Sequence, residues 1–153
     1  VTGGAQGFGL AITKRFLNSG AKVIIWDIDE EEAKKALNKI NSKSLSYQVV
    51  DVGNIDAIIK NLSQVENLHG KIDIFINNAG ITGMNTTVEN YPIDEWNNVI
   101  NLNLNAVFYC CKAYYRKRKI HVDLLIIAKP RFYRNPRYKI LSNPLTVSIQ
   151  VGS

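Results

Sequence analysis

The chain opens on a glycine-rich segment, Thr2-Gly3-Gly4-Ala5-Gln6-Gly7-Phe8-Gly9, that leads into an amphipathic helical pattern. Backbone N–H groups at the start of such a helix, together with its positive dipole end, can hold a pyrophosphate. The glycines let the backbone approach the phosphates closely and let the helix pack tightly on a sheet. The pattern therefore indicates a phosphate-binding turn, with an ordinary glycine-rich turn as the alternative.

A second candidate, Asp27, ends a short β-branched run 18 residues after Gly9. An acidic residue about 20 residues beyond a phosphate-binding turn can bind the ribose hydroxyls of a dinucleotide. Its carboxylate would repel a 2′-phosphate, and neither Gln6 nor Ile28 supplies a compensating cation. We therefore predict NAD as the cofactor in preference to NADP. The alternative role for Asp27 is to cap the helix that follows.

The elements that must position these residues alternate along the chain. Hydrophobic spacing predicts helices over residues 10–17, 29–40, 55–68 and 92–113, and strands over 22–27, 45–50 and 72–76, with a possible further strand at 122–128. Such alternation predicts right-handed βαβ units in an α/β fold, a Rossmann-like doubly wound parallel sheet whose ligands bind beyond the carboxyl ends of the strands. We expect this sheet to be incomplete at both ends, because Val1 directly precedes the glycine turn and no clean period follows Lys129.

Two further motifs follow the third and fourth predicted strands, Asp51-Val52 and Asn77-Asn78-Ala79-Gly80. With the glycine turn, they resemble the signature of the short-chain dehydrogenase/reductase family over about residues 1–113. The resemblance implies that Asp51 and Val52 contact the adenine and that residues 78–80 line the adenosine side and brace the sheet. The expected cofactor-binding residues are Gly3, Gly7, Phe8, Gly9, Asp27, Asp51, Val52, Asn78, Ala79 and Gly80.

The same resemblance implies an NAD(P)-dependent oxidoreductase that transfers a hydride between the nicotinamide and an alcohol or carbonyl substrate, similar to the 3-oxoacyl reductases. The family's reaction uses a Tyr that exchanges a proton with the substrate oxygen, a Lys one helical turn away that lowers the pKa of that Tyr, and a Ser that polarises the carbonyl. Asn103 is expected to be the catalytic helix asparagine of the proton relay, with Asn101 and Asn105 as alternatives in the same run.

The sequence after the long helix departs from that pattern. Lys129-Pro130-Arg131 stands where the Ser is expected. Tyr115–Lys119 has the Tyr-x-x-x-Lys spacing but precedes the predicted fifth strand, and Tyr133–Arg137 contains a proline that would break the required helix. We therefore predict that the chain as it stands is inactive. The alternative function is a non-catalytic dinucleotide-binding module with a basic interaction tail.

Charge divides the chain near residue 113. Residues 1–113 carry 10 Lys/Arg against 12 Asp/Glu, whereas residues 114–153 carry 9 Lys/Arg against one Asp. We expect a dinucleotide-binding core over 1–113 and a basic, divergent tail over 114–153. Basic and aromatic residues are interspersed in the tail as in some nucleic-acid-binding segments, but we favour a shift of reading frame over nucleic-acid binding.

The composition limits the classes of protein to which this chain can belong. A chain of 153 residues with 46% hydrophobic and 21% charged side chains has the composition of one soluble domain. It contains no run of about 18 apolar residues and no basic-then-apolar leader, so we expect a cytoplasmic protein that does not cross a membrane. Adjacent Cys110 and Cys111 suit neither a disulfide nor a metal knuckle, so we expect free thiols and no metal site. The family resemblance implies a homo-oligomer.

The other two reading frames of the encoding DNA test the frame-shift hypothesis for the tail. We expect one of them, downstream of residue 113, to encode a Ser followed by a Tyr-x-x-x-Lys segment. If neither frame does, the basic tail is the protein's own sequence and the hypothesis is wrong.

Overall fold

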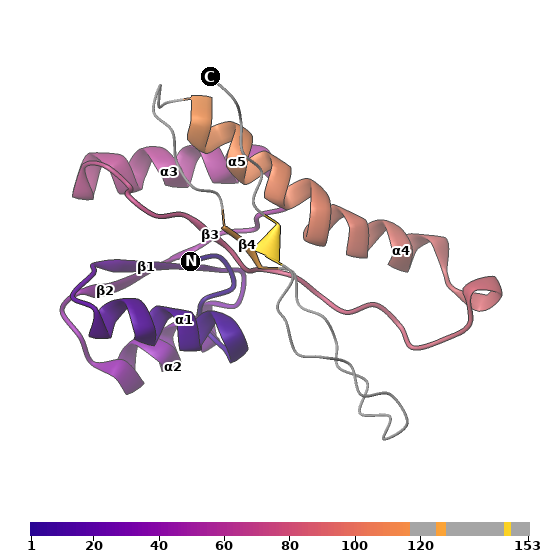
Figure 1. The fold of residues 1–153 in the computed structure, drawn as a ribbon, viewed down its shortest axis with the longest axis horizontal. Helices are drawn as coiled ribbons and strands as arrows, with labels where there is room; N and C mark the ends of the chain where they lie inside the picture. Colours follow the sequence, from indigo (N-terminus) through magenta and orange to yellow (C-terminus); the bar gives the residue numbers. More distant parts are fainter. Residues whose placement is uncertain (117–124, 128–145, 148–153) are drawn as a thin grey trace.

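The structure is a computed structural model that describes residues 1–116, 125–127 and 146–147 (Figure 1). The helices are α1 (Gly7–Asn18), α2 (Glu30–Ile40), α3 (Ile55–His69), α4 (Ile93–Ile100) and α5 (Ala106–Arg116), with a 3₁₀ turn, η1 (Val88–Asn90), and a π-helical turn, η2 (Asn101–Asn105). The strands are β1 (Val23–Asp27), β2 (Leu45–Val49), β3 (Ile76–Asn77), β4 (Leu125–Ile127) and β5 (Thr146–Val147).

The strands form a mostly parallel sheet in two parts that the first residues of the chain connect. β1 pairs in parallel with β2, β3 pairs in parallel with β4, and β5 lies antiparallel to β4. Thr2 forms a parallel bridge with Trp26 of β1, and its N–H donates to the carbonyl of Ile76 in β3 at 3.0 Å. The order β2, β1, residues 1–2, β3, β4 is that of a doubly wound Rossmann sheet, so the predicted fold class is confirmed.

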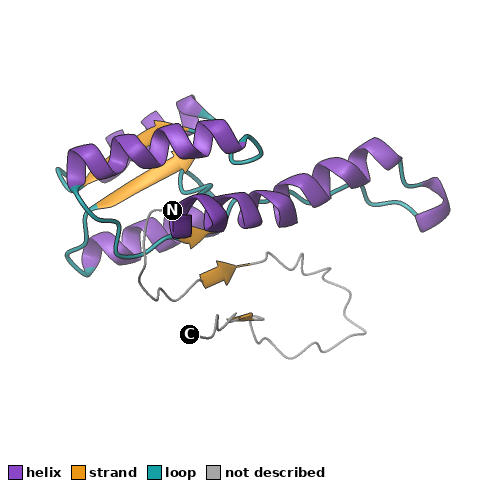
Figure 2. Cartoon of the chain, turned by 90° about the horizontal axis from the view of Figure 1, so that it is seen from above, coloured by secondary structure: helices purple, strands orange, loops and turns teal. Residues whose placement is uncertain are grey.

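Helices cover both faces of this sheet, with α1 and α2 on one face and α3 and α5 on the other (Figures 1 and 2). Successive side chains of a strand point to opposite faces. Val23 and Ile25 accordingly pack in the cluster beside α1 and α2, whereas Ile24 and Trp26 pack in the cluster beside α3 and α5. Burial on both faces explains why β1 is a continuous apolar run.

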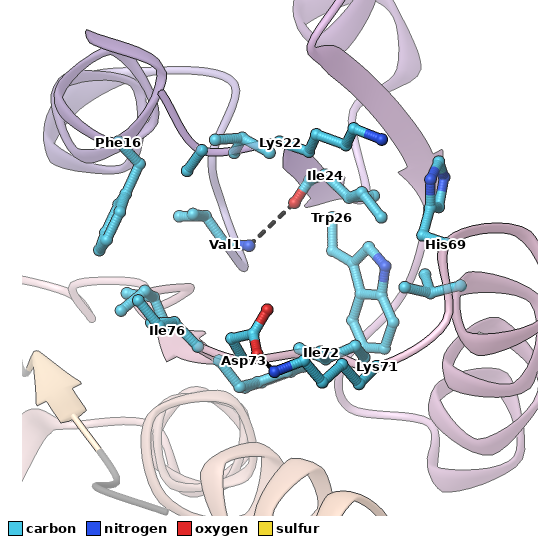
Figure 3. A pocket seen from close by; sticks show the side chains of 15 residues that line it. Val1, Phe16, Lys22, Ile24, Trp26, His69, Lys71, Ile72, Asp73 and Ile76 are labelled. Atoms are coloured by element: carbon cyan, nitrogen blue, oxygen red, sulfur yellow. Dashed lines mark hydrogen bonds and ion pairs between the residues drawn. The ribbon is translucent and has the colours of Figure 1, made fainter. Parts of the chain in front are cut away.

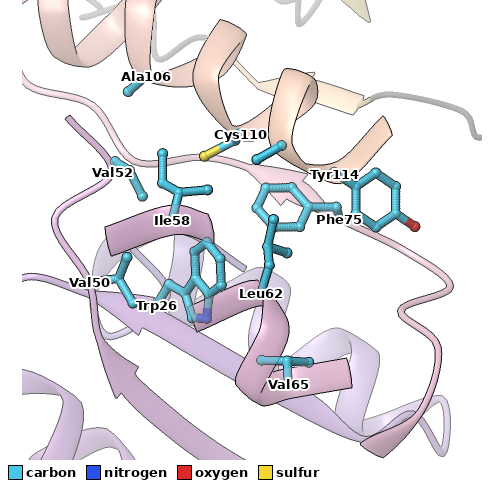
Figure 4. Close-up of a cluster of buried hydrophobic side chains, with 11 residues drawn as sticks. Trp26, Val50, Val52, Ile58, Leu62, Val65, Phe75, Ala106, Cys110 and Tyr114 are labelled. Atoms are coloured by element: carbon cyan, nitrogen blue, oxygen red, sulfur yellow. The ribbon is translucent and has the colours of Figure 1, made fainter. Parts of the chain in front are cut away.

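The larger core lies between the sheet and helices α3 and α5 (Figure 4). Three aromatic rings meet there: Phe75 lies edge-on to Trp26 with 5.5 Å between ring centroids and 5.7 Å from Tyr114. The Tyr114 hydroxyl donates to the carbonyl of Ile72 at 2.6 Å. This core anchors α5 to the sheet and thereby positions the π turn that precedes it.

The strand predicted over 72–76 is wrong in its extent, because β3 comprises only Ile76–Asn77. In a parallel sheet a segment is held as a strand by its neighbours. Residues 72–75 pair with no strand among the described residues. At the other edge, β4 falls inside the predicted range 122–128, of which residues 122–124 and 128 lie outside the described part.

The helix predicted over 92–113 is interrupted by η2, and Pro92 is its N-cap. A π turn inserts an extra residue, so an apolar stripe drawn at constant helical spacing changes face there. Trp96, Leu104 and Phe108, which an uninterrupted helix over 92–113 would bury on one apolar side, are 55%, 61% and 60% exposed. The residues of α5 that reach the core are instead Ala106, Cys110, Ala113 and Tyr114.

Within the described residues, no helix is long and apolar enough to cross a membrane, and no group of three or more His, Cys, Asp or Glu side chains is placed to hold a metal ion. Cys110 and Cys111 are free. Burial raises the pKa of the Cys110 thiol to about 12 and also raises that of Cys111. Both side chains are therefore neutral thiols at physiological pH.

The backbone of Val1 joins the chain to β1. Its nitrogen donates to the carbonyl of Ile24 (Figure 3), and its carbonyl accepts from the N–H of Trp26, both at 2.9 Å.

Candidate functional site

A cleft of about 340 Å³ lies at the carboxyl ends of β1, β2 and β3, where the glycine turn meets the sheet. It is lined by Gly3, Gln6, Gly7, Trp26, Asp27, Ile28, Val50, Asp51, Val52, Ala79, Gly80, Ile81 and Leu102. Seven of the residues predicted from the sequence to bind a cofactor therefore line a single cleft. The other three, Phe8, Gly9 and Asn78, lie outside this lining.

The amino end of α1 opens toward this cleft. Gly3 and Gly7 have positive φ angles of 59° and 54°, a conformation that glycine adopts without strain. A Cβ on Gly7 would meet no atom within 4 Å. The N-cap Gln6 makes no side-chain hydrogen bond, and the first turn holds no acidic residue. Its N–H groups and dipole end are therefore available to an anion.

Gly9 packs α1 against the sheet, on the side of the turn away from the cleft. A Cβ at this position would overlap the carbonyl oxygen of Gly3 and lie 2.6 Å from Nδ2 of Asn78. Only glycine permits this approach. Phe8, by contrast, is 60% exposed on the first turn of the helix and lines neither wall of the cleft.

Asp27 is buried at the end of β1 and holds the glycine turn. Its Oδ2 accepts a hydrogen bond from the N–H of Ala5 at 3.1 Å, and its Oδ1 accepts from Asp29 at 3.2 Å. The helix-capping role considered for Asp27 belongs to Asp29, whose side chain accepts from the N–H of Glu32 at 3.0 Å. The Asp27 carboxylate thus lies in the cleft wall with its orientation set by two backbone donors.

Thr2 and Asn78 join the glycine turn to the end of β3. The Thr2 hydroxyl accepts from the N–H groups of Asn78 and Ala79 at 2.9 and 3.0 Å. In return, Nδ2 of Asn78 donates to the carbonyls of Thr2 and Gly3 at 2.9 and 3.1 Å. Oδ1 of Asn78 is buried and has no hydrogen-bond partner among the described residues. Asn78 therefore braces the turn from behind, and its neighbours Ala79 and Gly80 face the cleft.

Asn103 is placed in the π turn η2, where its amide contacts the segment after β3. Its Oδ1 accepts from the N–H of Ile81 at 2.9 Å and its Nδ2 donates to the Ile81 carbonyl at 2.8 Å. Of the alternatives, Asn105 donates instead to Asn101 at 3.5 Å. A Cβ on Gly80 would lie 3.0 Å from Oδ1 of Asn103, which explains the glycine there. The side chain of Asn103 thus positions the cleft wall.

Asp51 and Val52 follow β2 at the far end of the cleft from the glycine turn. Asp51 is exposed, and its Oδ1 accepts from the N–H of Gly53 at 2.8 Å. Val52 is buried in the core beside α3 and also reaches the cleft. This corner offers one acidic and one apolar contact to a ligand.

The sequence missed six residues of the lining. Two of them, Trp26 and Val50, directly precede the predicted Asp27 and Asp51. Gln6 and Ile28 adjoin predicted residues. In the sequence they were noted only because neither carries a positive charge that could pair with a 2′-phosphate. Ile81 and Leu102 enter the wall because Asn103 draws the segment after β3 against η2. Ile81 directly follows the Asn77–Gly80 motif, and that position was the sequence signal that could have identified it. No sequence signal indicated Leu102. Of the rejected catalytic pairs, Tyr115 lies on α5, whereas Lys119, Tyr133 and Arg137 lie outside the described residues.

Comparison with known families and proteins gives a consistent result. The profile of the short chain dehydrogenase family matches residues 1–121. A 3-oxoacyl-(acyl-carrier-protein) reductase FabG of Chlamydia pneumoniae is 36% identical over 118 residues, covering 76% of this chain and 47% of the relative. A 3beta-hydroxysteroid dehydrogenase of Mediterraneibacter gnavus is 36% identical over 115 residues, covering 73% and 41%. The chain spans about half the length of the curated relatives it matches.

Solved structures agree with this result. A short chain dehydrogenase from Bacillus anthracis superimposes with a TM-score of 0.75 at 33% identity, covering 81% of this chain and 53% of that one. A xylitol dehydrogenase bound to NAD⁺ superimposes with a TM-score of 0.72 at 32% identity, covering 75% and 45%. A serine dehydrogenase complexed with NADP⁺ is also similar, with a TM-score of 0.70 at 32% identity over 76% and 46%.

The brace between Asn78 and the glycine turn predicts a large effect of Asn78→Asp. A carboxylate there would face the carbonyls of Thr2 and Gly3 without a donor, so we expect the free energy of unfolding to fall by about 3 kcal/mol. Urea unfolding measures it. The matched control, Asn98→Asp on the exposed face of α4, should change stability by less than about 0.5 kcal/mol. Equal stabilities of the two variants would refute the brace.

Proposed function

The chain belongs to the short chain dehydrogenase family, and on that basis we propose that its cleft binds NAD through the pyrophosphate and adenosine. We further propose that the protein is an NAD(P)-dependent oxidoreductase acting on a small alcohol or carbonyl substrate, similar to its 3-oxoacyl reductase relatives. One observation carries the cofactor proposal: the open amino end of α1 and the buried carboxylate of Asp27 face the same cleft.

The pyrophosphate would lie at the amino end of α1. Gly3 and Gly7 line the cleft there, and the space beside Gly7 is open, so a phosphate can approach the backbone N–H groups of the first turn. The helix dipole adds a favourable charge interaction. Phe8 would contribute its backbone N–H, because its side chain points to solvent.

The adenosine would extend from Asp27 toward Asp51 and Val52. Asp27 accepts one backbone hydrogen bond on each oxygen, and a carboxylate oxygen can accept two, so capacity remains for the ribose hydroxyls. In the described part of the chain the lining contains two aspartates and neither Lys nor Arg. A 2′-phosphate would meet this negative charge unpaired, so we infer a preference for NAD over NADP.

The catalytic half of the proposal rests on resemblance. When bound, the nicotinamide would donate or accept the hydride. Asn103 is proposed as the family's relay asparagine; in this chain its side chain holds Ile81, so it would act by positioning the π turn and the cleft wall. The sequence offers no Ser with a Tyr-x-x-x-Lys segment in the expected place, so we propose that this chain binds the cofactor without turnover. That outcome would equally describe a non-catalytic dinucleotide-binding module.

For the whole protein we propose a cytoplasmic homo-oligomer. Trp96 of α4, Leu104 of η2 and Phe108 of α5 are exposed apolar side chains, which a second copy could cover. We do not propose a nucleic-acid partner, because the basic residues of 114–153 follow a core that is net negative.

Replacement of Asp27 by Asn tests the cofactor proposal. Loss of a charged hydrogen bond to the ribose should raise the Kd for NADH about tenfold, while the Kd for NADPH should stay unchanged or fall because a repulsive charge is removed. NADH and NADPH fluorescence titrations of the folded proteins measure both. Asp94→Asn, on the exposed first turn of α4, is the control and should bind as the parent does. Tighter binding of NADPH than NADH by the parent chain would contradict the preference.

A turnover assay separates the enzyme from the binding module. The parent chain is mixed with NADH and a 3-oxoacyl thioester, or with NAD⁺ and a panel of alcohols, and the absorbance of NADH is followed. We expect binding without turnover. A rate above the protein-free background would contradict the proposed inactivity and favour the enzyme.

A further inference from the structure

The strand β2 forms one edge of the described sheet (Figure 1). It pairs with β1 on one side, in unbroken register from Leu45 to Val49, and no strand of the described residues pairs with its other side. We call this other side the β2 edge. Natural proteins protect such edges with charged residues, prolines or bulges, because an open edge can pair with another strand. Residues 45–49 contain no charged residue and no proline, so the β2 edge has none of these protections.

The backbone of every second residue of β2 faces the β2 edge. The carbonyl of Ser44 accepts from the N–H of Val23 in β1 at 2.8 Å. Because a strand bonds to one neighbour through alternate residues, positions 46 and 48 also bond to β1, whereas Leu45, Tyr47 and Val49 direct their polar groups outward. Among the described residues, the N–H and C=O groups of Tyr47 and Val49 have no hydrogen-bond partner. These groups are available to a further strand.

The side chains at the β2 edge suit strand pairing. Tyr47 is half-buried beside α2, and its hydroxyl donates to Glu30 at 3.5 Å. Val49 lies on the same face of the sheet and is 47% exposed. Aromatic and β-branched side chains stabilise a pair of strands when they lie directly opposite each other. A further strand would therefore cover the exposed parts of both side chains.

The residues around β2 are self-complementary about Tyr47. If two identical strands pair antiparallel with Tyr47 on the twofold axis, Leu45 lies opposite Val49 of the second copy. Lys43 precedes Leu45 by two residues and Asp51 follows Val49 by two, so these opposite charges come together at both ends. Both charged side chains are exposed, and neither has an ion-pair partner among the described residues. A twofold interface requires such a match of one surface with itself.

We propose that two copies of this chain associate through the β2 edge as an antiparallel pair of strands, which joins their sheets into one. The N–H of Tyr47 donates to the carbonyl of Tyr47 in the second copy, and the N–H of Val49 donates to the carbonyl of Leu45. The interface is separate from the exposed apolar side chains of α4, η2 and α5, and it does not depend on cofactor binding. Because Asp51 also lines the candidate cleft, the interface ends beside that cleft.

Charge reversal tests the pairing of Lys43 with Asp51. Sedimentation velocity over about 5–500 µM protein measures the dimer, a range suited to a small interface. Lys43→Asp and Asp51→Lys each place like charges together at both ends, so each should raise the dimer Kd about tenfold. The double variant Lys43→Asp/Asp51→Lys restores opposite charges and should return the Kd to that of the parent. A parent that stays monomeric, single variants that associate like the parent, or a double variant no better than the singles would each overturn the proposal.

Two variants on α5 are the controls. Lys112→Asp makes the same change of charge away from β2, and Phe108→Ser removes an exposed apolar side chain; both should associate as the parent does. Loss of association in these variants, with no loss in the β2 variants, would place the interface on α5 and overturn the proposal. Circular dichroism shows that each variant is folded.

Amide hydrogen exchange of the parent chain locates the contact. The N–H groups of Tyr47 and Val49 should exchange rapidly in dilute protein and about tenfold more slowly when nine-tenths of the chains are dimeric, because only the free chain exposes them. The N–H groups of Ser46 and Gln48, which bond to β1, should be slow in both samples. Protection of Tyr47 and Val49 that does not change with concentration would mean that the same chain covers the edge. That result, or rapid exchange in the associated sample, would overturn the proposal.

Discussion

The structure depends on the hydrogen bonds that Val1 and Thr2 make to both sides of the sheet. Without these two residues, β1 and β2 would share no strand with β3, β4 and β5. The backbone of Val1 bonds to β1, and the backbone of Thr2 bonds to β3. Thr2 and Asn78 add hydrogen bonds between side chain and backbone in both directions, where the backbone ladder between residues 1–2 and β3 is short. Because Thr2 and Asn78 are buried, water does not compete for the hydrogen bonds between their side chains and backbones.

The cleft at the carboxyl edge follows from this connection. Asn78 holds the glycine turn against the end of β3, and Asp27 holds it against the end of β1 through Ala5. The turn is therefore fixed on both sides before any ligand binds, which limits the conformational entropy lost on binding. Gly9 is required for the same reason, since a side chain there would separate α1 from the sheet. Asp27 thus both organises the turn and faces the proposed ribose position.

One wall of the cleft is continuous with the larger core. Trp26 lines the cleft and belongs to that core, and its indole N–H donates to Gln48 of the neighbouring strand at 2.7 Å. Its ring packs edge-on against Phe75. The packing that holds α5 therefore also supports the wall of the cleft.

Local patterns in the sequence determined much of this protein. The glycine spacing, the β-branched run ending at Asp27 and the Asn77–Gly80 motif predicted the order of elements and the edge of the sheet at which seven predicted residues meet. Such features act over a few residues, so they can be recognised without knowing the fold. Only the tertiary structure decided the short extent of β3, the exposure of Phe108 and the hold of Asn103 on Ile81. Each of these features depends on which distant segment of the chain packs against the residue. Hydrophobic spacing along one helix or strand does not indicate which segment that is.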